Sequence, residues 1–162
     1  MTAERNIAIT SYSEDVVAGS SLLEKRISGS ATRSFKFVKK NGEEGEGSFS
    51  SETLAEQPIV VKVKRSLADN SQISREIVSG TRINTHKNGS IAEISFSGLL
   101  IEGAGESCNL KSGNFSIKNL DSAGTMLSSI SCSAEDGSLS CTDASGMDVE
   151  QEVPLCDPSD DK

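Results

Sequence analysis

Short segments in which apolar and polar residues alternate run through most of this chain, with turn-forming residues between them. Alternation with a period of two places the apolar side chains on one face of a β-strand. It recurs around Phe35, Val61, Ile83, Phe115 and Ile130, and turn signals separate the segments every ten or so residues. The pattern predicts an all-β, antiparallel fold of about eight to ten strands, a hairpin-rich meander that forms a single sandwich or closed barrel.

The clearest hairpin is expected over residues 77–103, where Asn88-Gly89 separates two alternating segments. Asn and Gly both accept the positive φ angles of a type I′ turn, so a two-residue turn is predicted there. Folding the chain about that turn sets Ile83 opposite Ile94, and the two side chains would then share one dry face. The ribbon would give neighbouring strands a surface on which to assemble.

Residues 33–40 predict another strand, with Phe35 and Phe37 pointing inward. A tight turn at Asn41-Gly42 would put Phe49 on the opposite face from Phe35, whereas a loop of odd length lets the two rings share a face. The hydrophobic pattern favours the second arrangement, and we adopt it.

Three other segments complete the expected fold. Residues 16–31 fit either a strand or a single helical turn, because Ser21-Leu-Leu-Glu24 matches a capping box while glycines oppose a long helix. Residues 58–67 alternate as a strand with basic residues on its outer face. A turn at Ser112-Gly113-Asn114 would divide the chain before Leu120 into a hairpin.

Composition and charge fit one domain, residues 1–162, with a modest core. The chain is 35% hydrophobic, with no Trp, one Tyr and five Phe. The first 103 residues carry 13 Lys and Arg against 13 Asp and Glu, so the whole net charge of −8 lies in residues 104–162. This acidic last third repels phosphate and argues against nucleic-acid binding. Its end, residues 143–162, is expected to be a solvated acidic segment, and no apolar run suits a transmembrane helix.

Catalytic, cofactor-binding and metal-ligating motifs are missing from the sequence. The one histidine, His86, stands beside a turn with no nameable partner for base catalysis or metal binding. Gly103-Ala-Gly105 begins like a dinucleotide fingerprint, but Cys108 replaces the third glycine. A faint calcium-loop pattern fails because Ala123 and Ile130 stand at ligand positions. We predict no catalytic residue, no cofactor and no metal, and therefore a protein that is not an enzyme.

The four cysteines, Cys108, Cys132, Cys141 and Cys156, all lie in the last third of the chain. Their even number and the lack of a C-x-x-C pair favour two disulfides over buried free thiols. A two-residue turn at Asp136-Gly137 sets Cys132 opposite Cys141 in a non-hydrogen-bonded pair, close enough for a bridge. Elimination then pairs Cys108 with Cys156. Disulfides predict an extracytoplasmic protein (secreted, periplasmic or at the cell surface) whose leader has been removed.

The absence of these motifs leaves three hypotheses for the function. The first hypothesis is a non-enzymatic extracytoplasmic module that binds a partner protein, a glycan or a surface. The second is a β-barrel carrier of a small apolar ligand, and the third, less favoured, is a carboxylate-based hydrolase. The residues that would line a carrier, or else form plain core, are Phe35, Phe37, Val61, Ile83, Ile94 and Phe96. Plain core is favoured, because a chain so poor in aromatic residues has little apolar surface to spare.

Overall fold

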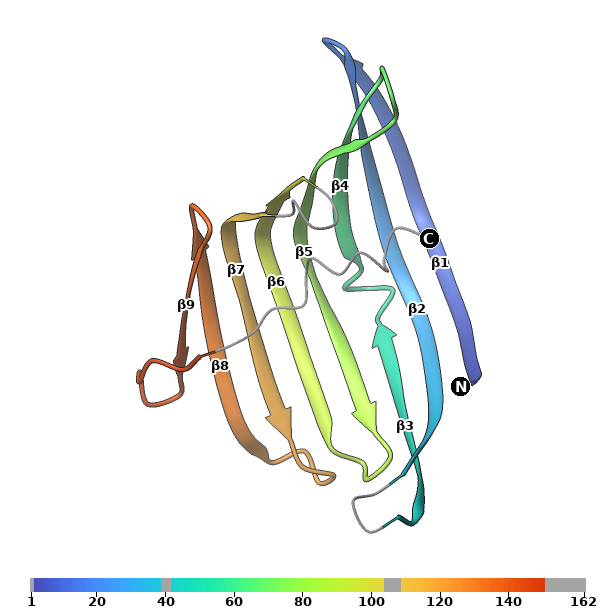
Figure 1. Ribbon diagram of the computed structural model, residues 1–162, viewed down its shortest axis with the longest axis vertical. Coiled ribbons are helices and arrows are strands. Elements are labelled where there is room, and N and C mark those ends of the chain that lie inside the picture. Colours follow the sequence, from blue (N-terminus) through green and yellow to red (C-terminus); the bar gives the residue numbers. More distant parts are fainter. Residues whose placement is uncertain (1, 39–41, 104–108, 151–162) are drawn as a thin grey trace.

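The computed structural model describes residues 2–38, 42–103 and 109–150, which form one antiparallel sheet of nine strands (Figure 1). The strands are β1 (Thr2–Val17), β2 (Ser20–Val38), β3 (Glu44–Thr53), β4 (Ile59–Ser66), β5 (Gln72–His86), β6 (Ile91–Glu102), β7 (Asn109–Leu120), β8 (Met126–Glu135) and β9 (Ser138–Asp143). Their order across the sheet is β1-β2-β3-β5-β6-β7-β8-β9, and β4 pairs with β2 and β5. No helix occurs among these residues. The predicted all-β, antiparallel meander is confirmed.

Strands β3 and β4 occupy one position in the sheet, between β2 and β5. Along β2, Gly29 pairs with Thr53 at the end of β3, and Ile27 pairs with Ile59 at the start of β4. Residues 54–58 therefore bulge out of the sheet where Ser28 of β2 would otherwise have a partner. Because β3 and β4 both pair with β5 as well, the strands β2, β3, β5 and β4 close a ring.

Apolar side chains gather on one side of the sheet, which we call the apolar face; the other side is the polar face. The buried cluster on the apolar face consists of Ile77, Leu99, Phe115, Cys132 and Cys141. Leu99 is fully buried, as is Ile101 on the same strand. Complete burial of a side chain of this size contributes about 1.5–3 kcal/mol to folding. This cluster therefore lies over β5–β9 and fixes which face of these strands remains polar, while Val61 and Val63 are buried on β4.

The turn between β8 and β9 forms as predicted. Asp136 and Gly137 both have positive φ, 46° and 85°, as a type I′ turn requires. The resulting register pairs Cys132 with Cys141, and a disulfide joins them with the Cα atoms 4.1 Å apart. The predicted Cys108–Cys156 pairing lies outside the described residues.

The turn between β5 and β6 differs from the prediction. Gly89 has a positive φ of 82°, but Asn88 does not, and the amide of His86 donates to the carbonyl of Ser90. The loop therefore has three residues rather than two. The Asn88 side chain explains this, because its Oδ1 accepts hydrogen bonds from the amide and the hydroxyl of Ser90.

The longer loop shifts the register of the ribbon by one residue. Ile83 pairs with Glu93, and Ile94 pairs with Arg82. A one-residue shift moves a side chain to the other face, so Ile83 and Ile94 lie on opposite faces. The ribbon is confirmed, but the expected Ile83–Ile94 pair is wrong.

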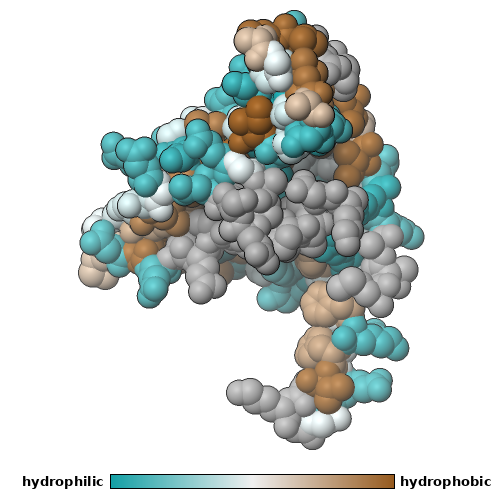
Figure 2. All heavy atoms as spheres, turned by 45° about the horizontal axis from the view of Figure 1, so that its top comes forward, coloured by the Kyte–Doolittle hydropathy of each residue, from teal (hydrophilic) through white to brown (hydrophobic). Residues whose placement is uncertain are grey.

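The ends of β2 and β3 extend beyond the sheet as a two-stranded arm, residues 35–38 and 44–48. Arg33 pairs with Phe49, so Phe49 and Phe35 share a face, as the hydrophobic pattern predicted. The prediction that Phe35 and Phe37 point inward is wrong: they are 37% and 44% exposed. The reason is that β1 and β5 end before the arm, so no third strand covers the rings. Apolar side chains show on this narrow arm in Figure 2.

Two other expectations are settled by the strands themselves. Residues 16–31 contain no helical turn, because β1 and β2 join through a tight turn at Ala18-Gly19.

The turn predicted at Ser112-Gly113-Asn114 is wrong, because β7 runs unbroken through these residues. Gly113 has a φ of 110°, and a Cβ there would collide with the carbonyl of Gly98 on β6. The glycine thus permits a close approach of two strands rather than a turn.

Candidate functional site

Five neighbouring strands carry the same triplet, in which two hydroxyl or amide residues flank one central residue. The triplets are Ser79-Gly80-Thr81 on β5, Ser95-Phe96-Ser97 on β6, Asn114-Phe115-Ser116 on β7, Ser131-Cys132-Ser133 on β8 and Ser140-Cys141-Thr142 on β9. Successive side chains of a strand point to opposite faces. The central Phe and Cys residues therefore join the apolar face, and the flanking residues lie on the polar face.

The strand registers align these triplets into two straight rows across the sheet. The first row is Thr81, Ser95, Ser116, Ser131 and Thr142, and the second is Ser79, Ser97, Asn114, Ser133 and Ser140. In each row every residue pairs directly with the next. We call these ten residues the hydroxyl field.

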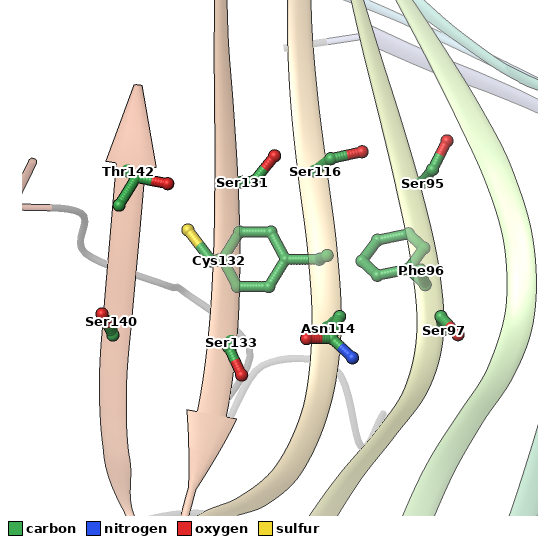
Figure 3. A pocket seen from close by; sticks show the side chains of 11 residues that line it. Ser95, Phe96, Ser97, Asn114, Ser116, Ser131, Cys132, Ser133, Ser140 and Thr142 are labelled. Atoms are coloured by element: carbon green, nitrogen blue, oxygen red, sulfur yellow. The ribbon is translucent and has the colours of Figure 1, made fainter. Parts of the chain in front are cut away.

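The hydroxyl field has regular dimensions because it is built on a sheet. Neighbouring strands lie about 4.8 Å apart, and residues two apart along a strand about 6.8 Å, so the field measures roughly 19 by 7 Å. Figure 3 shows the four-strand part from β6 to β9, with one row on either side of Phe96 and Cys132. This part lines an open hollow of about 460 Å³.

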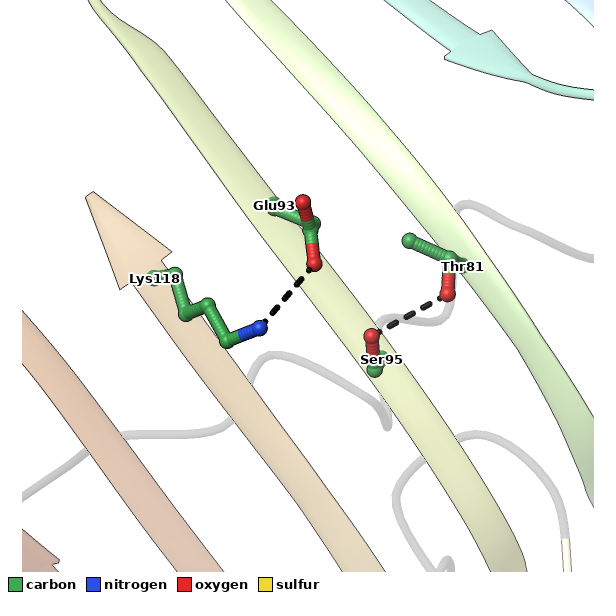
Figure 4. Close-up of polar contacts among 4 residues, drawn as sticks. All are labelled: Thr81, Glu93, Ser95 and Lys118. Carbon is green, nitrogen blue, oxygen red and sulfur yellow. Dashed lines mark hydrogen bonds and ion pairs between the residues drawn. The ribbon is translucent and has the colours of Figure 1, made fainter. Parts of the chain in front are cut away.

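Most groups of the hydroxyl field face solvent. Among the described contacts, Thr81 Oγ1 lies 3.1 Å from Ser95 Oγ, a hydrogen bond between neighbours in the first row (Figure 4). Ser97, Asn114, Ser131, Ser133 and Ser140 are all exposed. A hydroxyl both donates and accepts hydrogen bonds, so the field offers donors and acceptors in a fixed array.

The hydroxyl field contains no charged side chain, and two ion pairs flank it on β6 and β7. Lys118 Nζ lies 3.5 Å from Glu93 Oε1 at one end (Figure 4), and Lys111 Nζ lies 3.6 Å from Glu102 Oε2 at the other. Both ion pairs join adjacent strands on the polar face. The ten residues of the field therefore carry no formal charge, despite the net charge of −8, and the exposed Glu135 lies two residues beyond Ser133 on β8.

Two carboxylates with shifted pKa values, Asp143 and Asp69, lie in turns rather than in the hydroxyl field. The hydroxyl of Ser145 and nearby amides hold the pKa of Asp143 below its ordinary value, and Ser71 does the same for Asp69. Hydrogen bonds to the ionised carboxylate cause both shifts. Neither carboxylate lines the hydroxyl field, so these shifts report on local turn structure.

The six residues proposed to line a ligand cavity or form core are dispersed. Val61 is buried opposite Ile77, whereas Phe35 and Phe37 lie on the exposed arm. Phe96 packs against the core cluster from β6. Ile94 lies on the apolar face and Ile83 on the polar face, both partly buried. The structure thus brings Val61 and Phe96 to the core region but does not gather all six around one cavity.

The residues considered for metal or acid–base chemistry have no partners of that kind in the described ranges. His86 is exposed at the end of β5 and pairs in register with Phe49. In residues 2–38, 42–103 and 109–150, no three His, Cys, Asp or Glu residues are placed to hold a metal ion. No helix of the described chain is long and apolar enough to cross a membrane.

Sequence reasoning missed the hydroxyl field, although its signal is present in the chain. The repeated triplet, with Phe or Cys between two small polar residues, could have been read on β6–β9. The rows themselves depend on the strand registers, which the turn between β5 and β6 shows to be hard to infer. Comparisons with protein-family models, curated proteins and solved structures found no match.

Proposed function

We propose that this chain is a non-enzymatic, extracytoplasmic binding domain that uses the hydroxyl field to bind a neutral, hydroxyl-rich ligand, of which a glycan is the representative class. The observation that carries the proposal is the alignment of ten small polar residues into two rows over five strands. The disulfide between Cys132 and Cys141 supports the oxidising compartment.

The chemistry of the hydroxyl field favours a glycan over the other candidate partners. A charged partner gains affinity from opposite charge, and this surface has none to offer. A protein partner usually inserts aromatic or apolar anchors into a dry centre, and the exposed side chains here are hydroxyls and one amide. A glycan presents many neutral donors and acceptors, which match those of the field.

The expected affinity is modest. Each hydrogen bond contributes about 0.5–1.5 kcal/mol net, because both partners give up water. Three or four such bonds near the upper end of this range, above the cost of association, correspond to dissociation constants of about 0.1–1 mM for a short oligosaccharide. Longer polysaccharides would bind more tightly by offering repeated sites.

Affinity gel electrophoresis tests the proposal. Native gels would contain laminarin, dextran, galactomannan or hydroxyethyl cellulose, with polygalacturonate as an acidic counterpart. We expect at least one neutral polysaccharide to retard the protein, with little effect of added salt, because screening does not weaken neutral contacts. Retardation by polygalacturonate alone, or by none of these polymers, would contradict the assignment.

A triple variant, S95A/S116A/S131A, locates the binding surface. Loss of three hydroxyls should weaken binding by at least about tenfold. The matched control is S34A/S48A/S50A, which removes three hydroxyls from the polar face of β2 and β3, outside the field. Equal binding by both variants would place the ligand elsewhere.

A further inference from the structure

Strand β1 forms one edge of the sheet, and its length makes that edge unusual. The strand spans 16 residues, Thr2–Val17, and in the described structure it pairs only with β2. An edge strand presents a row of backbone amides and carbonyls ready to pair with another strand. Proteins commonly protect such edges with Pro, charged side chains, bulges or a covering segment. β1 has no Pro, its charged residues (Glu4, Arg5, Glu14 and Asp15) lie toward its two ends, and its pairing with β2 has one irregularity, between Ile9 and Ser11. The central residues 6–9 carry none of these devices.

The opposite edge of the sheet is protected. Strand β9 has only six residues, and the chain that follows it turns back on the strand. The amide of Val149 donates to the carbonyl of Cys141, and Thr142 forms an isolated bridge with Asp148. Among the described residues, the fold thus covers its short edge and leaves the long one without a second strand.

Two isoleucines show which strand would suit the β1 edge. Ile7 and Ile9 lie on the same face of β1 and are 55% and 56% exposed. Ile9 pairs with Ile27 on β2, and Ile7 and Ile27 line a second, smaller hollow. An added strand would cover them best if it carried two apolar residues with the same spacing, and β1 itself has that pattern.

We propose that β1 pairs antiparallel with β1 of a second copy of this chain, with the two-fold axis at Ala8. This register sets Ile7 opposite Ile9 of the other copy twice, and aliphatic cross-strand pairs stabilise a sheet. Registers centred on Ile7 or Ile9 allow only one isoleucine pair. Around Ala8, the charges of Glu4 and Arg5 face the uncharged stretch 11–13 of the other copy, so no like charges meet.

Light scattering coupled to size-exclusion chromatography tests the dimer. We expect the full chain to approach twice 17.0 kDa as its concentration rises. Ile7→Lys should return it to a monomer, because two lysines would lie at the centre of the pairing. Leu127→Lys is the matched control: it also replaces an exposed apolar residue (65% exposed), but on β8. A wild-type monomer at every concentration, or equal dimers in both variants, overturns the proposal.

Cysteine cross-linking tests the register. Ala8→Cys places a thiol at the two-fold axis, where facing Cα atoms are about 4.5–5.5 Å apart, within disulfide range. Mild oxidation should therefore give a covalent dimer. Glu4→Cys, on the same strand, is the control, because positions 4 of the two copies would lie about 26 Å apart. No cross-link in Ala8→Cys, or equal cross-linking in both variants, refutes this register even if the chain is dimeric.

Discussion

Removal of the Cys132–Cys141 disulfide should measurably destabilise the domain. The bridge closes a loop with a sequence separation of 9 residues. On the loop-entropy model, a loop of this size restricts the unfolded chain by about 2.5–3 kcal/mol. Both cysteines are also nearly buried, at 3% and 4% exposure, and pack in the core cluster. The C132A/C141A variant should therefore lose at least about 2.5 kcal/mol of unfolding free energy.

Urea unfolding followed by circular dichroism measures this loss directly. The double variant is preferable to chemical reduction, because it changes only these two cysteines. At about 2–4 °C for each kcal/mol, the thermal midpoint should fall by about 5–12 °C. The slope of the urea transition should stay close to wild type if the native fold is kept. A loss below about 1 kcal/mol, with the fold intact, would refute the reasoning from loop closure and burial.

Three further changes test separate features. Phe115→Ala, at a 6% exposed core position, should cost about 3–5 kcal/mol in urea unfolding, and a loss under 1 kcal/mol would show that the core is not there. Gly113→Ala should destabilise more than Gly146→Ala: both have positive φ, but only at Gly113 does a Cβ meet backbone, so equal losses would contradict the close strand approach. An NMR titration should find the pKa of Asp143 below the ordinary 3.8, because Ser145 donates to its carboxylate. Its stabilising effect is present above pH 3.8 and lost as the pH falls through the folded pKa; Asp143→Asn removes this dependence, and a raised pKa would contradict the turn geometry.

The two turn dipeptides show how far local sequence determines a register. Asp136-Gly137 forms the expected two-residue turn, and every pair between β8 and β9 follows from it. Asn88-Gly89 has the same kind of composition, but the Asn88 side chain bonds to Ser90 and a three-residue loop results. The residue that decides the loop length, Ser90, lies just outside the dipeptide. Strand existence was therefore predictable in both hairpins, but register in only one.

Neither the exposure of Phe35 and Phe37 nor the alignment of the hydroxyl field could be predicted from the sequence of a single strand. Phe35 and Phe37 alternate like core residues, yet they are exposed because β1 and β5 end before the arm. The polar triplets of the field are visible one by one, but their alignment needs four correct registers in succession. Irregular pairing, such as that between Ser97 and Leu100 on β6, shifts those registers further. Local pattern thus predicts faces better than it predicts which residues meet across strands.

The ring of β2, β3, β5 and β4 has a consequence for the order of folding. From β5 to β9, each strand pairs with the next along the chain, and at most six residues separate consecutive strands, so little chain entropy opposes these steps. Closing the ring requires β2 to meet β4, with Ser20 opposite Ser66. We expect the β5–β9 meander to form first and the ring to close last. Pulsed hydrogen exchange during refolding would then protect amides of β6–β8 before the amides that join β2 to β4, and the reverse order would contradict this sequence of events.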